Sequence, residues 1–158
     1  MLDGDYARLS DFNTDGPMII NFWTTWWTFC ERQLAYLDQL NKHFSKVGLK
    51  VLAVNANKPN ILNQVRPYIN KRKYKFPVSV DPRGKLAKTF RVVGYPSLFF
   101  VDHNGRIFHK SSGYEDGEEH EYLKRLLEYY KKNKIIHEEF KFQKQVTGTE
   151  TSKVIIDF

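Results

Sequence analysis

A chain of 158 residues with 41% hydrophobic content is long enough to bury one compact core without disulfide staples. Its single cysteine excludes an internal disulfide framework and a cysteine-rich zinc site, and no apolar run approaches the roughly 20 residues of a membrane-spanning helix. The net charge of +7 is spread along the chain without a recognised nucleic-acid motif, so we expect no nucleic-acid partner.

The first half of the chain alternates between strand and helix. Residues 18–24 form a buried apolar strand, after which Leu34, Leu37 and Leu40 recur at helical spacing until Gly48 ends the helix. Residues 50–55 supply a second strand, and residues 76–80 a third. Between them, residues 61–73 have a helical pattern in which Pro67 predicts a kink or a break.

The second half reads as a hairpin followed by a helix. A turn at residues 81–84 leads to a short helix near residues 86–90, and strands at 97–101 and 107–110 flank Asn104-Gly105, a strong hairpin signal. Residues 118–132 form the last clear helix. A βαβ half followed by a ββα half predicts an α/β protein with a mixed central sheet flanked by helices, which is the thioredoxin fold.

Specific residues carry a family resemblance. The segment Asn21-Phe22-Trp23-Thr24-Thr25-Trp26, followed by Cys30, resembles the N-F-W-A-T-W-C-x-x-C segment of the TlpA/ResA branch of thioredoxin-like thiol-disulfide oxidoreductases. Leu9-Ser10-Asp11-Phe12, Phe76-Pro77-Val78 and Val93-Gly94-Tyr95-Pro96 extend the resemblance over residues 6 to about 132. We therefore expect a thioredoxin-like domain over residues 1–132 and a C-terminal extension over residues 133–158.

The resemblance implies that Trp27 occupies the position of the nucleophilic cysteine and Cys30 that of the resolving cysteine. An indole cannot form a mixed disulfide, so the chain cannot run the dithiol cycle unaided. Cys30 is expected to be a small buried hydrophobe; the alternative is a reachable monothiol that accepts glutathione or a partner in a mixed disulfide. Whether the chain is an enzyme stays open at this point.

The same resemblance places substrate binding at Trp26, Tyr95 and Pro96. It implies a cis peptide bond at Tyr95-Pro96, in a loop that packs opposite the active site and binds extended peptides through its backbone. Trp26 and Trp27 either close the former active site or offer an apolar contact to a partner. Asn21 is expected to be structural.

The resulting functional hypothesis is a redox-inactive module that binds a protein or peptide at the former active-site face. One alternative is a monothiol redox protein that uses Cys30, and another is a variant of an active TlpA/ResA-like oxidoreductase into which Trp27 was introduced. We expect no cofactor and no metal, because the histidines lack ligand spacing and His137-Glu138-Glu139 is followed by Lys141 instead of the second histidine of a zinc motif.

The C-terminal extension, residues 133–158, lies beyond the family resemblance. Phe140, Phe142 and Val146 precede a polar stretch, after which residues 154–158 are largely apolar. We expect a β-hairpin on the sheet edge or an arm that pairs with another subunit, which would make a homo-oligomer. The resemblance implies a periplasmic or other extracytoplasmic location, with any leader absent from this chain; a cytoplasmic location is the alternative.

Overall fold

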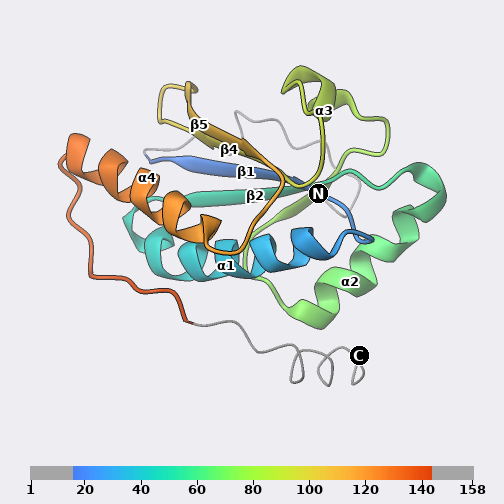
Figure 1. The fold of residues 1–158 in the computed structure, drawn as a ribbon, viewed down its shortest axis with the longest axis horizontal. Coiled ribbons are helices and arrows are strands. Elements are labelled where there is room, and N and C mark those ends of the chain that lie inside the picture. The colour runs from blue at the N-terminus through green and yellow to red at the C-terminus, as the bar shows by residue number, and fades with distance from the viewer. Residues whose placement is uncertain (1–15, 144–158) are drawn as a thin grey trace.

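A mixed five-stranded sheet forms the centre of the molecule, which is described over residues 16–143 by a computed structural model (Figure 1). The strands lie in the order β3-β2-β1-β4-β5. They are β1 (Met18–Trp23), β2 (Lys50–Asn55), β3 (Val78–Val80), β4 (Ser97–Val101) and β5 (Ile107–Ser112). β1, β2 and β3 run parallel, while β4 pairs antiparallel with β1 and β5 antiparallel with β4. The α/β class and the mixed sheet are thereby confirmed.

Helices cover both faces of the sheet, but unequally. The long helices α1 (Thr28–Phe44) and α4 (Glu118–Lys132) lie side by side on one face, with α2 (Val65–Arg72) beyond the end of α1 (Figure 1). The other face carries α3 (Lys85–Thr89), which has only five residues. No helix in the described part of the chain is long and apolar enough to cross a membrane.

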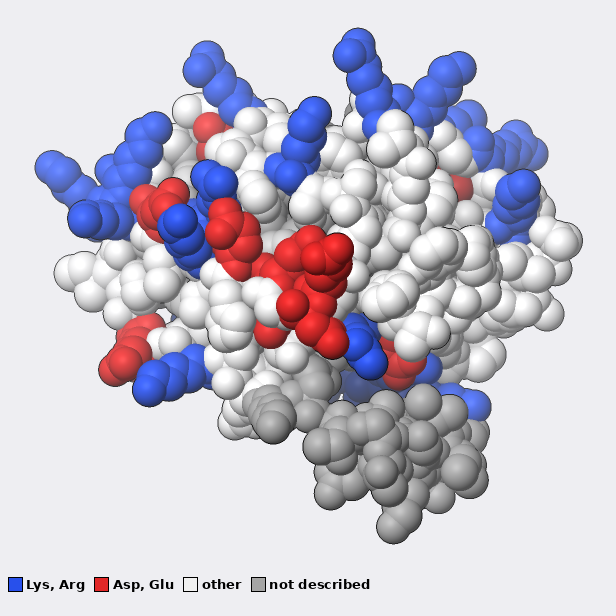
Figure 2. Space-filling model, viewed as in Figure 1, with Lys and Arg blue, Asp and Glu red and all other residues white. Residues whose placement is uncertain are grey.

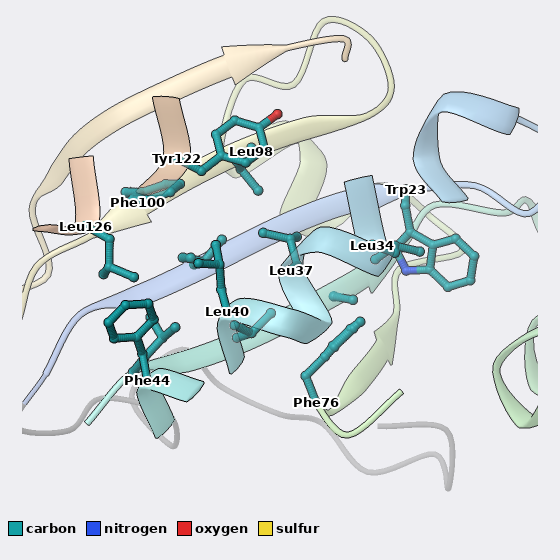
Figure 3. Close-up of a cluster of buried hydrophobic side chains, with 14 of the residues drawn as sticks. Trp23, Leu34, Leu37, Leu40, Phe44, Phe76, Leu98, Phe100, Tyr122 and Leu126 are labelled. Carbon is teal, nitrogen blue, oxygen red and sulfur yellow. The ribbon is translucent and has the colours of Figure 1, made fainter. Parts of the chain in front are cut away.

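Alternating side chains of the central strands fill two hydrophobic clusters. Leu98 and Phe100 point toward α1 and α4 (Figure 3). Together with Ile19 they belong to the same hydrophobic cluster as the leucines predicted from the helical spacing. Ile20 and Phe99, one position along each strand, point to the opposite face. This period of two is what a strand buried on both faces requires.

The predicted helix at residues 61–73 is split before Pro67. The 3-10 helix η3 (Pro59–Gln64) contains the non-helical residue Ile61, and α2 begins at Val65. Pro67 is therefore the third residue of α2, in the first turn, where no backbone N–H is needed for an intrahelical bond. The break that Pro67 predicts lies at the helix start.

The hairpin between β4 and β5 is closed by Asp102. Its Oδ1 accepts hydrogen bonds of 2.9 Å from the backbone N–H groups of both Asn104 and Arg106. Gly105 has a φ of 84°, a left-handed conformation that glycine adopts without strain. The Asn-Gly hairpin is therefore present as predicted.

After α4 the chain runs back across the outer surface of α1 without forming a strand among residues 133–143. Phe140 packs on Phe44 with ring centroids 5.3 Å apart, and Phe142 packs on Tyr36 at 5.3 Å. The side-chain amide of Gln39 accepts from the backbone N–H of Gln143 at 2.8 Å and donates to its carbonyl at 3.2 Å. Residues 144–158 lie outside the described part, so the hairpin or arm stays a prediction, as does the domain boundary at residue 132.

The positive charge forms no single continuous surface on the face shown in Figure 2. Lys and Arg side chains project around the periphery, whereas acidic side chains gather over the start of α4. The first turn of that helix contains Glu118, Glu119 and Glu121, which interact favourably with the positive end of the helix dipole.

Candidate functional site

The junction between β1 and α1 presents exposed aromatic side chains. Trp27 is the N-terminal cap residue of α1, with extended backbone angles and no capping hydrogen bond from its side chain. Trp26, Trp27 and Phe29 have exposed fractions of 59%, 40% and 46%, and the two indole rings meet edge to face at 5.3 Å. We call these three residues the aromatic patch. Trp27 thus lies partly exposed at the surface of the molecule.

Cys30 is the third residue of α1, in the first turn, and has no exposed surface. Its backbone N–H donates to the carbonyl of Trp27 at 3.0 Å. Burial raises the pKa of the Cys30 thiol to about 11, against smaller opposing effects of hydrogen bonds with Thr24. Because the thiolate is the reactive form, these surroundings suppress the chemistry that a cysteine offers.

A hydrogen-bonded clamp holds the loop that carries the tryptophans. The amide of Asn57 accepts from the backbone N–H of Thr25 at 3.1 Å and donates to the Thr25 hydroxyl at 2.8 Å. Asn57 is itself held by Asn55, whose Oδ1 accepts from the Asn57 N–H at 2.9 Å. The Thr25 hydroxyl also donates to Gln64 at 3.0 Å. The loop is thereby fixed to the end of β2 and to η3.

The Tyr95–Pro96 peptide bond is cis. It immediately precedes β4, whose first residue, Ser97, is the pairing partner of Phe22 near the end of β1. The cis proline and the aromatic patch therefore extend from the same end of the sheet. Pro96 is buried and its carbonyl accepts from Gly113 at 2.7 Å, whereas Tyr95 is half-buried and packs against both hydrophobic clusters.

A buried polar chain runs beneath this end of the molecule. Asn21 on β1 donates to Gln33 on α1, which donates to the Tyr122 hydroxyl on α4 at 2.8 Å. That hydroxyl donates in turn to Glu118 at 2.8 Å, and burial raises the pKa of Tyr122. The chain of hydrogen bonds ties β1, α1 and α4 together, consistent with a structural role for Asn21.

Two ion pairs orient the first turns of α1. Arg32 pairs with Asp116 at 2.9 Å on the surface, and Glu31 pairs with Arg72 of α2 at 3.1 Å in a partly buried position. The guanidinium of Arg72 also lies 3.4 Å from the ring centroid of Tyr68. The helix start therefore has contacts on both sides of Cys30.

The sequence interpretation missed Gln33, Asn57 and Tyr122 as site-supporting residues. Gln33 interrupts the apolar face of α1 at a buried helical position, and Asn55 and Asn57 follow a buried strand in an Asn-x-Asn pattern. Such polar residues at buried positions need hydrogen-bond partners, which is the signal that could have identified them. Among residues 16–143, no three His, Cys, Asp or Glu side chains are grouped as a metal would require.

Comparisons with known proteins agree with this geometry. The sequence profile of the AhpC/TSA family matches residues 2–110. The thiol-disulfide oxidoreductase ResA of Bacillus thuringiensis subsp. konkukian is 31% identical over 126 residues, which cover 79% of this chain and 71% of that protein.

Solved structures are similar as well. The exposed lipoprotein thioredoxin Etrx1 of Streptococcus pneumoniae strain TIGR4 matches with a TM-score of 0.66 and 27% identity, over 80% of this chain and 94% of its own. StoA of Bacillus subtilis matches with a TM-score of 0.61 and 26% identity, over 73% of this chain and 84% of its own.

Proposed function

The chain belongs to the AhpC/TSA family and, within it, to the ResA-like thiol-disulfide oxidoreductases, and from this premise we propose that it is a member without dithiol chemistry that binds an extended segment of a partner protein. The observation that carries the proposal is the pair of residues at the former catalytic positions. Position 27 has an indole where a nucleophile is needed, and the remaining thiol at Cys30 is buried.

The alternative monothiol mechanism has less support. A mixed disulfide with glutathione requires a thiolate that solvent can reach, and a pKa of about 11 leaves about one thiolate in 10,000 molecules at pH 7. Cys30 is therefore assigned a packing role beneath the aromatic patch. The other alternative, that Trp27 was introduced into an active oxidoreductase, is addressed by restoring the cysteine.

The proposal of partner binding is supported by the surface around position 27, where the family has its nucleophilic cysteine. Aromatic side chains are enriched among the residues that dominate protein interfaces, and Trp26 and Trp27 expose much of their ring surface here. The cis Tyr95–Pro96 bond extends from the same end of the sheet. In this proposal the tryptophans anchor the partner, and Tyr95 and Pro96 contact its extended backbone.

An extracytoplasmic location fits this proposal. Etrx1, to which the chain is similar, is described as an exposed lipoprotein thioredoxin, and the ResA relatives are thiol-disulfide oxidoreductases. Protein disulfides, the targets of such enzymes, persist outside the reducing cytoplasm. The partner would then be an exported or cell-surface protein.

A disulfide-reduction assay separates the redox hypotheses. The unmodified chain is expected to show no turnover, whereas Trp27→Cys is expected to gain activity because it restores a thiol at the N-terminus of α1, where thiol pKa values fall. Trp27→Ser is the matched control, since it removes the same ring without adding a thiol. Turnover by the unmodified chain would refute the redox-inactive assignment.

Binding is tested by screening a library of extended peptides for changes in tryptophan fluorescence. Trp23 is fully buried, so a signal from a bound peptide should come from Trp26 and Trp27. Trp27→Ala is expected to weaken binding at least tenfold, while Ile136→Ala, which removes another highly exposed apolar side chain, should leave it unchanged. Equal binding by both variants would place the partner elsewhere.

A further inference from the structure

The sheet face opposite α1 and α4 is hollowed beside its outer strand. The hollow has a volume of about 730 Å³ and lies between the end of α3, the loop at Arg91–Val93, and the strands β4 and β5. Phe99 forms part of its floor, and its ladder partner Lys110 lies on the same side of the sheet. The five-residue α3 is the only described helix on this face, so part of it is left without a covering helix.

The rim of the hollow is apolar and positively charged. Val93 has 88% of its surface exposed and Ile107 has 48%, which is unusual for side chains of this kind. Arg91 and Lys110 also line the hollow, and no Asp or Glu is among its lining residues. An occupant that presents apolar side chains and carries no positive charge would fit this surface.

The outer strand supplies a place for such an occupant to pair. In the described part of the chain β5 pairs with β4 alone and has no strand on its other side. An unpaired edge presents backbone N–H and C=O groups to which another extended segment can add by hydrogen bonding. The hollow lies directly beside that edge, so an added strand would place alternate side chains against the hollow.

We propose that residues 154–158 of a second copy of this chain add to β5 and cover the hollow. This segment, Val154-Ile155-Ile156-Asp157-Phe158, consists mainly of β-branched and aromatic side chains, which favour strands, and it contains no Lys or Arg. In an extended segment, residues 154, 156 and 158 share one face, so three apolar side chains face the hollow together. Reciprocal exchange of the two tails gives a closed dimer.

The position of Gln143 favours a second copy over the chain's own hollow. Gln39 holds Gln143 on the outer side of α1, whereas β5 lies at the opposite edge of the molecule, beyond α4 (Figure 1). Residue 154 is eleven residue steps along the chain from residue 143, a stretch that spans about 36 to 40 Å when fully extended. That length projects the segment well away from α1 toward a neighbouring molecule, while a return to β5 would have to pass around the body of the same domain.

Engineered cysteines test the proposal directly, because Cys30 is buried and does not compete. We would mix two full-length proteins, one carrying Ile107→Cys and the other Ile156→Cys, and expose them to a mild oxidant. The expected result is a covalent heterodimer of twice the 18.7 kDa chain mass. Ile136→Cys replaces Ile107→Cys in the control mixture, since Ile136 is exposed and does not line the hollow, and it should give at least tenfold less product.

Two further measurements keep the result decisive. Light scattering of the unmodified chain should give a dimer, and Ile156→Lys should convert it to a folded monomer with an unchanged far-UV circular dichroism spectrum. A monomeric unmodified chain, a dimer that survives Ile156→Lys, or a crosslink that forms only within one double-variant chain at high dilution would overturn the proposal. A crosslink from Leu9→Cys to Ile107→Cys within one chain would also overturn it, because the N-terminal segment would then occupy the hollow.

Discussion

The Cys30 thiol should react with an alkylating reagent far more slowly in the folded protein than in the unfolded chain. Burial raises its pKa to about 11, whereas an unperturbed cysteine ionises near pH 8.5. At pH 8 the thiolate is then about one molecule in 1,000, against about one in four for a free cysteine. Ionisation alone therefore slows the reaction by about 200-fold, and the lack of exposed surface slows it further.

The assay is alkylation by iodoacetamide, followed by intact-mass spectrometry from pH 7 to pH 10. Because the thiolate reacts and the folded pKa lies above this window, the rate should rise about tenfold per pH unit without a plateau. The control in guanidinium chloride should label completely at one site, as the chain has a single cysteine. A native rate within tenfold of that control at pH 8, or a plateau below pH 9, would refute the reasoning and support the monothiol mechanism.

Three further predictions concern the scaffold. Gln33→Leu should lower the free energy of unfolding, measured in urea melts, by about 2 to 3 kcal/mol, because the buried amide of Asn21 loses its acceptor and the Tyr122 hydroxyl loses a donor. A loss below about 0.5 kcal/mol, on the order of an ordinary surface substitution, would contradict this. Asp81→Ala should cost about 1 kcal/mol by removing the carboxylate that accepts from two backbone N–H groups at the start of α3 at 3.2 and 2.9 Å. Asp81→Asn, which keeps an acceptor, is its control and should retain most of the stability. Phe140→Ala should speed hydrogen exchange of the Gln143 amide by about tenfold while leaving amides of β1 unchanged; equal acceleration of both would mean that the 133–143 segment does not open independently.

Local patterns in the sequence predicted most of the elements. The leucine spacing located α1, the Asn104-Gly105 pair located the hairpin, and Gly48, with a φ of 98°, ends the helical segment as expected. These features depend on near neighbours along the chain, through side-chain periodicity and backbone preference, so a single sequence contains them. The third strand starts at Val78 and not at residue 76, after Pro77, which lacks the N–H that strand pairing uses.

Contacts between distant residues were harder to predict. Thr25 and Asn57 are 32 positions apart, and Gln33 and Tyr122 are 89 apart. Their hydrogen bonds depend on how the elements pack, and the sequence alone shows only that buried polar residues need partners. Residues 133–143 show the same limit. The spacing of Phe140 and Phe142 resembles a strand, but this segment forms no strand and contacts α1 through its aromatic rings and Gln39.

The clamp between Thr25 and Asn57 also affects how a partner would bind. An indole on a loose loop loses conformational freedom when it is captured, and each immobilised side chain or loop segment subtracts from the affinity. Here the loop is already fastened to β2 and η3 before any partner arrives. Asn57→Ala should therefore weaken partner binding although it changes neither indole ring. Asn57, which does not itself belong to the aromatic patch, would then be a determinant of affinity.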